Sequence, residues 1–135
     1  MIVVDSNIIA YCWLNTPMTG NAQDVRVKDS EWHVPVLWRA ELRSIMTGYR
    51  RSGALSGQVT RRVMSHIEQE LAGSEHIVPS DDVFAVVEAC SLSAYDSEFV
   101  ALALALSVPL VTEDKAILRE FPRLAMSMAA FARNT

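Results

Sequence analysis

The amino-acid sequence predicts an α/β fold, a three-layer sandwich in which helices cover both faces of a central, mainly parallel and twisted sheet. Short apolar segments alternate with segments of helical periodicity along the chain, as in sheets whose strands are joined by helices. The first segment, residues 2–5, is apolar up to its last residue, which is typical of a strand covered on both faces. With 135 residues, 50% of them hydrophobic, the chain is long enough for one core and too short for two. We therefore expect a single domain over residues 1–135.

The first half of the chain is expected to alternate strands with helices. Pro17 and Gly20 mark a loop after the first helix, and Pro35 stops the second strand. Apolar residues then recur at helical spacing, and Gly73 suits the end of the last helix of this half. In chain order, the expected elements are a strand at 2–5, a helix at 7–14, a weak helix at 22–30, a strand at 31–35 and helices at 36–51 and 56–72.

The second half continues the same alternation. Ser80, Asp81 and Asp82 suit the start of a helix, because a small polar residue and early acids stabilise the free N–H groups there. The expected elements are a strand at 75–79, helices at 80–92 and 93–107, a strand at 108–112, a helix at 114–121, and a tail at 123–133 that forms an edge strand and a helical turn. No apolar stretch approaches the ~20 residues of a membrane span, and no signal peptide is recognisable, so we expect a cytoplasmic protein without a membrane partner.

Charge and composition exclude some classes of function. The net charge of −4 argues against a domain that binds nucleic acid through bulk attraction, but not against a nuclease, since bound cations would cancel clustered acids. Cys12 and Cys90 are expected to be small buried thiols rather than a disulfide. The three histidines, His33, His66 and His76, show no ligand spacing, so a zinc site is not predicted.

Four acidic residues fall where a ligand site of such a sheet is expected. Ligands bind beyond the carboxyl ends of the strands, and Asp5 ends the first strand while Asp114 follows a later one. Glu41 shares a helix face with apolar side chains and would cost several kcal/mol if it were buried unpaired. Asp96 lies in the first turn of a helix that is otherwise almost wholly apolar.

Each acid also has a simpler explanation. Asp5 can start a turn, Asp114 can cap the helix that follows it, Asp96 can complete a capping box with Ser93, and Glu41 can pair with Arg39 or another neighbour. Four such coincidences are less probable than one shared role. Clustered oxygen ligands select a hard cation, Mg²⁺ or Mn²⁺, and such ions suit the hydrolysis of phosphodiester bonds.

Three segments of the chain together resemble a known family. They are Val-Val-Asp-Ser-Asn-Ile-Ile-Ala-Tyr at 3–11, the segment 34–46 around Glu41, and the segment 94–117, which contains Asp96 and Asp114. In order and spacing they are similar to PIN-domain ribonucleases, in particular the VapC toxins of bacterial toxin–antitoxin pairs, over essentially the whole chain.

The resemblance implies an endoribonuclease that depends on Mg²⁺ or Mn²⁺. Asp5, Glu41 and Asp96 match the three core acids, which bind the metal and serve catalysis, and Asp114 matches the fourth, with Glu113 beside it as an alternative. The positions that support this cluster through hydrogen bonds in the family match the residues Asn7 and Thr112.

The resemblance also implies partners: an RNA substrate, a cognate antitoxin that lies in an apolar groove near the active site, and a second copy of the chain. Phosphate contacts are expected from Arg39, Arg43, Arg50 and Arg51, of which 39, 43 and 50 share a helix stripe; the alternative is a solvated surface or intramolecular ion pairs. Two other functions stay open. One is a PIN-like domain that binds RNA or a partner without cutting; the other is a receiver-type signalling domain, which Ser6 and Asn7 after Asp5 do not favour.

Overall fold

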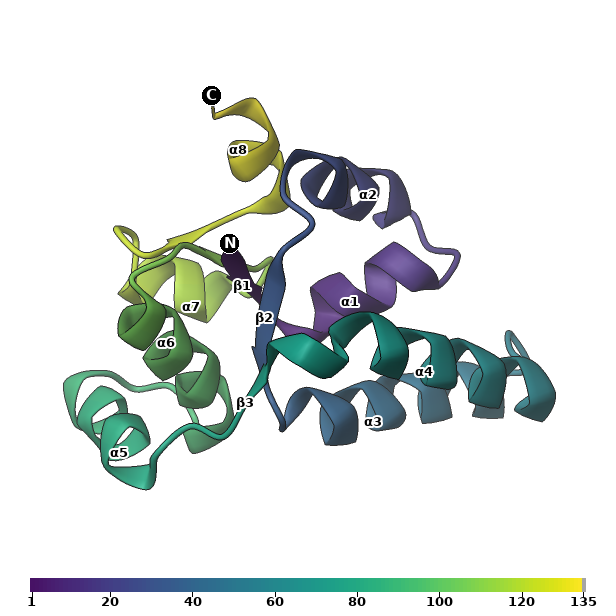
Figure 1. Cartoon of the computed structure of the whole chain (residues 1–135), viewed down its shortest axis with the longest axis horizontal. Coiled ribbons are helices and arrows are strands. Elements are labelled where there is room, and N and C mark those ends of the chain that lie inside the picture. The colour runs from purple at the N-terminus through teal and green to yellow at the C-terminus, as the bar shows by residue number, and fades with distance from the viewer. Residues whose placement is uncertain (135) are drawn as a thin grey trace.

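The computed structural model describes residues 1–134 and contains one sheet of five parallel strands in the order β3-β2-β1-β4-β5 (Figure 1). The predicted α/β class is confirmed, and the sheet is entirely rather than mainly parallel. The strands are β1 (Ile2–Val4), β2 (Trp32–Pro35), β3 (Glu75–His76), β4 (Leu110–Val111) and β5 (Ala125–Met126). The helices are α1 (Ser6–Trp13), α2 (Thr19–Lys28), α3 (Trp38–Arg51), α4 (Gly57–Leu71), α5 (Ser80–Ala89), α6 (Ala94–Leu106), α7 (Lys115–Glu120) and α8 (Met128–Arg133), with a short 3₁₀ turn, η1 (Ala72–Ser74), after α4.

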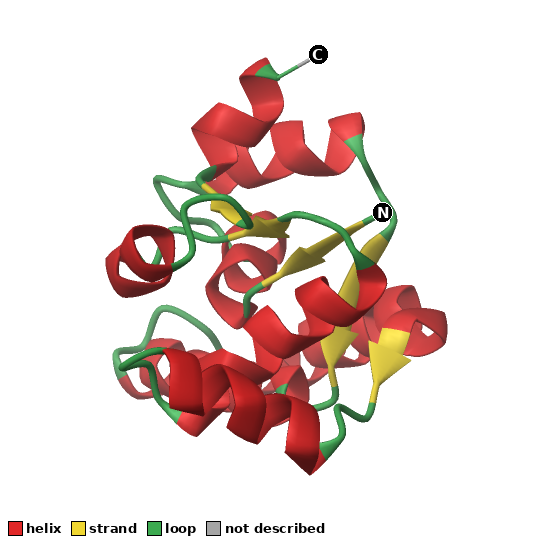
Figure 2. Cartoon of the chain, turned by 90° about the vertical axis from the view of Figure 1, so that its left-hand side faces the viewer, coloured by secondary structure: helices red, strands yellow, loops and turns green. Residues whose placement is uncertain are grey.

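Helices cover both faces of the sheet (Figures 1 and 2). Successive side chains of a strand point to opposite faces, and β1 shows this directly: Val3 packs with α5, α6 and α7, whereas Val4 packs with α1 to α4 and α8. In β4, Leu110 and Val111 divide in the same way. The central strand is therefore apolar on both sides, and only the residue that follows it is free to be polar.

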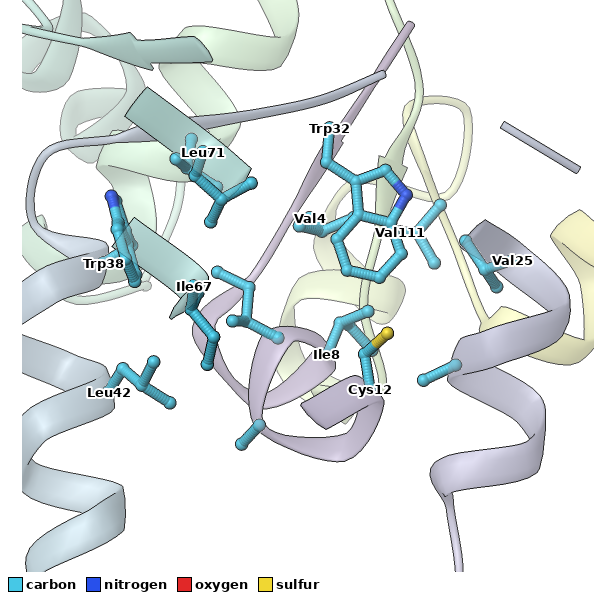
Figure 3. Packing of buried hydrophobic residues seen from close by; sticks show 14 of the residues in the cluster. Val4, Ile8, Cys12, Val25, Trp32, Trp38, Leu42, Ile67, Leu71 and Val111 are labelled. Carbon is cyan, nitrogen blue, oxygen red and sulfur yellow. The ribbon is translucent and has the colours of Figure 1, made fainter. Parts of the chain in front are cut away.

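The larger of the two cores packs around two buried tryptophans (Figure 3). Trp32 of β2 and Trp38 of α3 are at most 1% exposed, and Leu42, Ile67 and Leu71 fill the space between α3, α4 and the sheet. Fully burying one such side chain contributes roughly 1.5–3 kcal/mol. This packing fixes the amino-terminal half of α3, which carries Glu41, against the sheet.

Several predicted boundaries were wrong by a few residues. The second helix begins at Thr19 instead of residue 22, because the hydroxyls of Thr16 and Thr19 bond to each other and to the backbone of this turn, and Gly20 lies inside the helix. The third strand ends at His76 rather than residue 79, and α5 ends at Ala89 rather than 92. The elements themselves occur in the predicted order.

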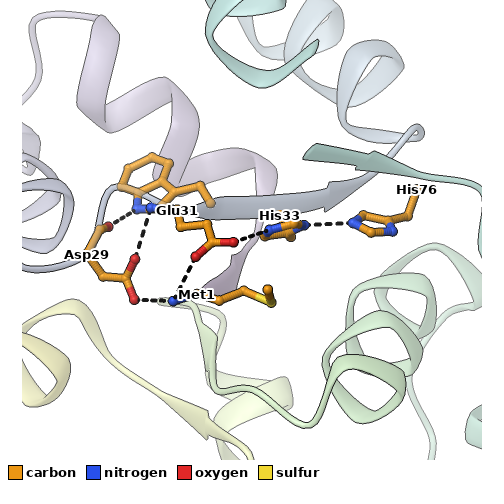
Figure 4. Close-up of polar contacts among 6 residues, drawn as sticks. Met1, Asp29, Glu31, His33 and His76 are labelled. Atoms are coloured by element: carbon orange, nitrogen blue, oxygen red, sulfur yellow. Dashed lines mark hydrogen bonds and ion pairs between the residues drawn. The ribbon is translucent and has the colours of Figure 1, made fainter. Parts of the chain in front are cut away.

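A chain of polar contacts crosses from the start of β1 to β2 and on to β3 (Figure 4). The Met1 amino group lies 2.5 Å from Asp29 and 3.7 Å from Glu31, and Glu31 lies 3.3 Å from Nε2 of His33. Nδ1 of His33 is in turn 2.7 Å from Nε2 of His76. The spacing in sequence did not predict this pair of histidines, which adjacent strands bring together.

Cys12 is buried, Cys90 is partly buried, and both are free thiols.

Within residues 1–134, no single helix is long and apolar enough to cross a membrane. The helices α5 and α6 meet the requirement of length and composition only as a pair, with a bend of 106° between them.

Candidate active site

The four predicted acids line one pocket, of about 260 Å³, beyond the carboxyl ends of β1 and β4. Asp5 directly follows β1, and Asp114 lies three residues after the end of β4. Glu41 comes from the first turn of α3 and Asp96 from the first turn of α6. The remaining residues of the lining are Ser6, Asn7, Ser44, Ile45, Phe99 and Ile117.

Asp5 is the most buried of the four carboxylates, with 7% of its surface exposed. It caps α1, since its Oδ1 accepts a hydrogen bond of 3.1 Å from the Ile8 amide. Burial raises the pKa of Asp5 to about 6. The hydrogen bonds from Thr112 and Ile8 lower this pKa, and the charge of Asp114 raises it by a smaller amount. Asp5 therefore both forms the turn at the start of α1 and lines the pocket.

Thr112 joins two of the acids. Its buried hydroxyl donates to Oδ2 of Asp5 and accepts a hydrogen bond of 3.0 Å from the backbone amide of Asp114. Asn7 also lines the pocket, but its side chain is exposed at the rim. Of the two predicted supporting residues, Thr112 contacts Asp5 through its side chain, whereas Asn7 contacts Asp5 through its backbone.

Glu41 is held by a residue that the sequence did not single out. The hydroxyl of Ser6, at the start of α1, donates a hydrogen bond of 2.8 Å to Oε1 of Glu41. Burial raises the pKa of Glu41, the bond from Ser6 lowers it, and the nearby charge of Asp96 raises it. The only sequence signal for Ser6 was its position directly after Asp5.

Asp114, rather than Glu113, faces the pocket. Oδ1 of Asp114 accepts a hydrogen bond of 2.9 Å from the Ile117 amide and so caps α7. The carboxylate of Glu113 instead accepts a hydrogen bond of 2.8 Å from the Met128 amide, at the start of α8. This geometry favours Asp114 as the fourth acid.

The four acids repel one another without a basic counter-charge. Burial raises the pKa of Asp96, and the charge of Asp114 raises it further, while the Ser93 hydrogen bond lowers it. Within residues 1–134, none of the four acids has a Lys, Arg or His side chain within ion-pair distance. The alternative that Glu41 pairs with Arg39 is not observed. Partly desolvated, uncompensated carboxylates of this kind attract a cation.

An all-oxygen donor set of this kind suits a hard divalent cation. As they stand, no three Asp, Glu, His or Cys side chains of residues 1–134 form a group that would hold a metal ion. Mg²⁺ usually keeps several waters and takes only one or two carboxylates directly, so carboxylates spread around a pocket are compatible with it. The residues therefore fit Mg²⁺ or Mn²⁺ better than a softer metal.

The predicted arginine contacts lie away from this pocket. Arg39 forms a two-point ion pair with Glu75, at 2.6 and 2.8 Å, and contacts Glu68. For Arg39, the structure thus shows intramolecular ion pairs, which were the alternative to the predicted phosphate contact. Arg43, Arg50 and Arg51 are exposed and line two other hollows between α3 and α4.

Comparison with known proteins is consistent with this geometry. The sequence profile of the PIN domain matches residues 2–124, whereas a search of curated proteins found no relative by sequence. The fold is similar to that of PAE2754 from Pyrobaculum aerophilum, with a TM-score of 0.73, 17% identity, and coverage of 97% of this chain and 92% of the other. It is also similar to FitAcB from Neisseria gonorrhoeae, with a TM-score of 0.68, 18% identity, and coverage of 96% and 99%. A chain of a toxin–antitoxin complex from Klebsiella pneumoniae aligns with a TM-score of 0.59, 15% identity, and coverage of 95% and 98%.

Proposed function

Because this chain belongs to the PIN-domain family, we propose that it is an endoribonuclease that hydrolyses RNA phosphodiester bonds with Mg²⁺ or Mn²⁺. The observation that carries the proposal is the pocket at the carboxyl edge of the sheet, where four carboxylates from four different elements meet without a basic partner among residues 1–134. A cation held by these acids would offset their charge, which would otherwise repel a phosphate.

Asp5, Glu41, Asp96 and Asp114 would hold the cation. When bound, a divalent ion lowers the pKa of water, polarises the phosphate and stabilises the leaving oxygen. Ser6 and Thr112 keep the Glu41 and Asp5 carboxylates in place through their hydroxyls, so these side chains need little reordering when the pocket is filled. Asn7 lines the pocket and is exposed, and we propose that its side-chain amide donates to an RNA phosphate or sugar.

The direct test is cleavage of RNA by the purified chain, free of any partner. We expect endonucleolytic products with Mg²⁺ or Mn²⁺, none with chelator, and a loss of at least about 100-fold in Asp5→Asn. Asp81→Asn is the matched control, since Asp81 is an acid of α5 outside the pocket. Cleavage that survives chelator and Asp5→Asn would contradict the proposal.

We further propose that the activity is that of a toxin controlled by an antitoxin protein, in the cytoplasm. The support is the similarity of fold to a chain of the toxin–antitoxin complex from Klebsiella pneumoniae, together with the resemblance of the sequence to VapC toxins. Expression of the chain should arrest the growth of the cells that produce it, and the substitution Asp5→Asn should relieve this arrest.

We also propose that the chain forms a homodimer. Light scattering after size-exclusion chromatography measures its mass, and a monomeric mass at micromolar concentrations would contradict this proposal.

The alternative is a PIN-like domain that binds RNA or a partner without cutting it. The presence of all four acids in one pocket speaks against it, because a binding domain has no need of uncompensated carboxylates that repel phosphate. The cleavage assay separates the two, since binding without cleavage in both metals would favour the alternative.

A further inference from the structure

The helical hairpin of α3 and α4 has a charge opposite to that of the rest of the chain. Residues 42–67 contain five of the twelve basic residues and none of the sixteen acids, in a chain whose net charge is −4. The five are Arg43, Arg50, Arg51, Arg61 and Arg62. All are exposed, and no acidic side chain of residues 1–134 lies within ion-pair distance of any of them.

Two of these arginines converge over the start of α4. A methyl group placed on Gly57 would lie 3.2 Å from Nη1 of Arg61 and 3.5 Å from Nε of Arg50. Arg61 Nη1 also donates a hydrogen bond of 3.2 Å to the Gly57 carbonyl. Two like charges therefore approach the same point, and the absence of a side chain on Gly57 leaves the space in which they do so.

The converging arginines line a hollow of about 350 Å³ between the end of α3 and the start of α4. Its lining is Thr47, Arg50, Arg51, Gly57, Thr60 and Arg61. A second hollow, which is lined by Arg43 and Arg61 but also by Glu68, adjoins it along the hairpin. Arg39 differs from these residues, because Glu68 and Glu75 already neutralise it.

We propose that this hollow is a second RNA-binding site, which holds backbone phosphates outside the cleavage site; the inference rests on the proposed ribonuclease function. Guanidinium groups present a planar fork of donors that matches phosphate oxygens, and they stay charged at any physiological pH. A phosphate between Arg50 and Arg61 would relieve their mutual repulsion, while the hydroxyls of Thr47 and Thr60 supply neutral donors beside it.

The site lies on a different flank of α3 from the acid pocket. Glu41, Ser44 and Ile45 face the pocket, whereas Thr47 and Arg50 face α4, on a separate stripe of the same helix. Glu41 and Arg50 are nine positions apart, which is roughly 14 Å along the helix axis. An RNA that occupies both sites must therefore extend over several nucleotides and bend around α3, and a short fragment at the acid pocket would not reach the arginines.

The test is binding of a fluorescent 30-nucleotide RNA to the whole chain in chelator, followed by anisotropy, so that cleavage plays no part. Arg50→Gln/Arg61→Gln should weaken binding at least about tenfold and reduce the slope of log K against log salt by about 1 to 2. Arg119→Gln/Arg123→Gln removes the same charge from exposed residues outside the hairpin and should change binding less than about threefold. Equal losses in the two double variants would overturn the site, as would no loss in either.

A variant that adds volume without removing charge provides a second test. Gly57→Ala places its methyl group between the two arginines, whereas Gly48→Ala, in α3, meets nothing within 4 Å. We expect weaker RNA binding only in Gly57→Ala. If instead a poly-glutamate peptide loses affinity in the Arg50/Arg61 double variant while RNA does not, the hollow binds an acidic polypeptide and the proposal is wrong. A chain that binds RNA through this hollow but never cuts it would contradict the proposed function alone.

Discussion

The hydroxyl of Ser6 donates a hydrogen bond of 2.8 Å to Oε1 of Glu41, so that the first residue of α1 orients a carboxylate carried by α3. The bond joins residues 35 positions apart in the sequence. It links the helix that Asp5 caps to the helix that brings the second acid, and it therefore couples the positions of two proposed ligands.

Removal of the Ser6 hydroxyl should loosen Glu41 without unfolding the protein. Groups that hold a metal ligand in place typically contribute 10- to 100-fold to metal affinity or activity, so we expect Ser6→Ala to weaken Mn²⁺ binding and RNA cleavage by about that factor. Calorimetric titration and initial rates measure the two. Ser44→Ala is the control, since Ser44 lines the same pocket and has no hydrogen bond to Glu41. Similar losses in both variants would mean that the bond has no special role.

The buried Asp5 predicts how stability depends on pH. Its pKa is raised from an ordinary value of 3.8 to about 6, so between these values the folded chain retains a proton that the unfolded chain has released. The free energy of unfolding of the metal-free protein should therefore fall as the pH rises from about 4 to above 6. In Asp5→Asn, the free energy of unfolding should fall by up to about 3 kcal/mol less over this pH range. Urea unfolding in chelator at a series of pH values measures the free energy of unfolding. Parallel curves of this free energy against pH for the unsubstituted protein and Asp5→Asn would refute the prediction.

Asp114 and Glu113 can be separated by substitutions that preserve their other roles. Asparagine caps helices as well as aspartate does, so Asp114→Asn should keep α7 capped while cleavage falls at least about 100-fold. Glu113→Gln retains the carbonyl oxygen that accepts from Met128 and should keep activity within about threefold. Cleavage rates and thermal melting give the two readouts. Loss of activity in Glu113→Gln alone would reverse the assignment.

Arg39 should matter for stability rather than for RNA. It ties α3 to Glu68 of α4 and to Glu75 of β3, and about a third of its side chain is exposed. After allowance for solvent screening, Arg39→Gln should lower the free energy of unfolding by about 1 kcal/mol, and by less in 1 M salt. The Arg43 side chain donates to the backbone carbonyl of Arg39 and, within residues 1–134, forms no ion pair, so Arg43→Gln should change the free energy of unfolding by under about 0.5 kcal/mol. A marked loss of RNA affinity in Arg39→Gln at unchanged stability would contradict this role.

The sequence was sufficient to predict the layers and the place of the four acids, because both follow from local patterns. A wholly apolar strand such as β1 must be central, and a residue at its carboxyl end must lie where ligands bind in parallel sheets. The pattern around Glu41 placed an acid on an inward helix face, and the structure places that acid at the pocket.

What could not be predicted depends on contacts between distant elements. The bond from Ser6 to Glu41, the pairing of His33 with His76 and the capture of Arg39 by Glu75 each join residues more than 30 positions apart. The start of α2 differs from the prediction for a local reason: Gly20 indicates a loop, but the hydroxyls of Thr16 and Thr19 stabilise the turn that begins the helix. Side-chain hydrogen bonds of this kind outweigh the low helix propensity of one glycine.

The pairing of β1 with β4 has a consequence for when the acid pocket is complete. Asp5 is synthesised before Thr112, which holds it and lies 107 positions further along the chain, and Asp114 follows Thr112. Parallel strands so far apart in sequence pair late in folding. The pocket is therefore incomplete in any nascent chain that lacks β4, and a ribonuclease built in this way would not attack RNA before that strand has been made and paired.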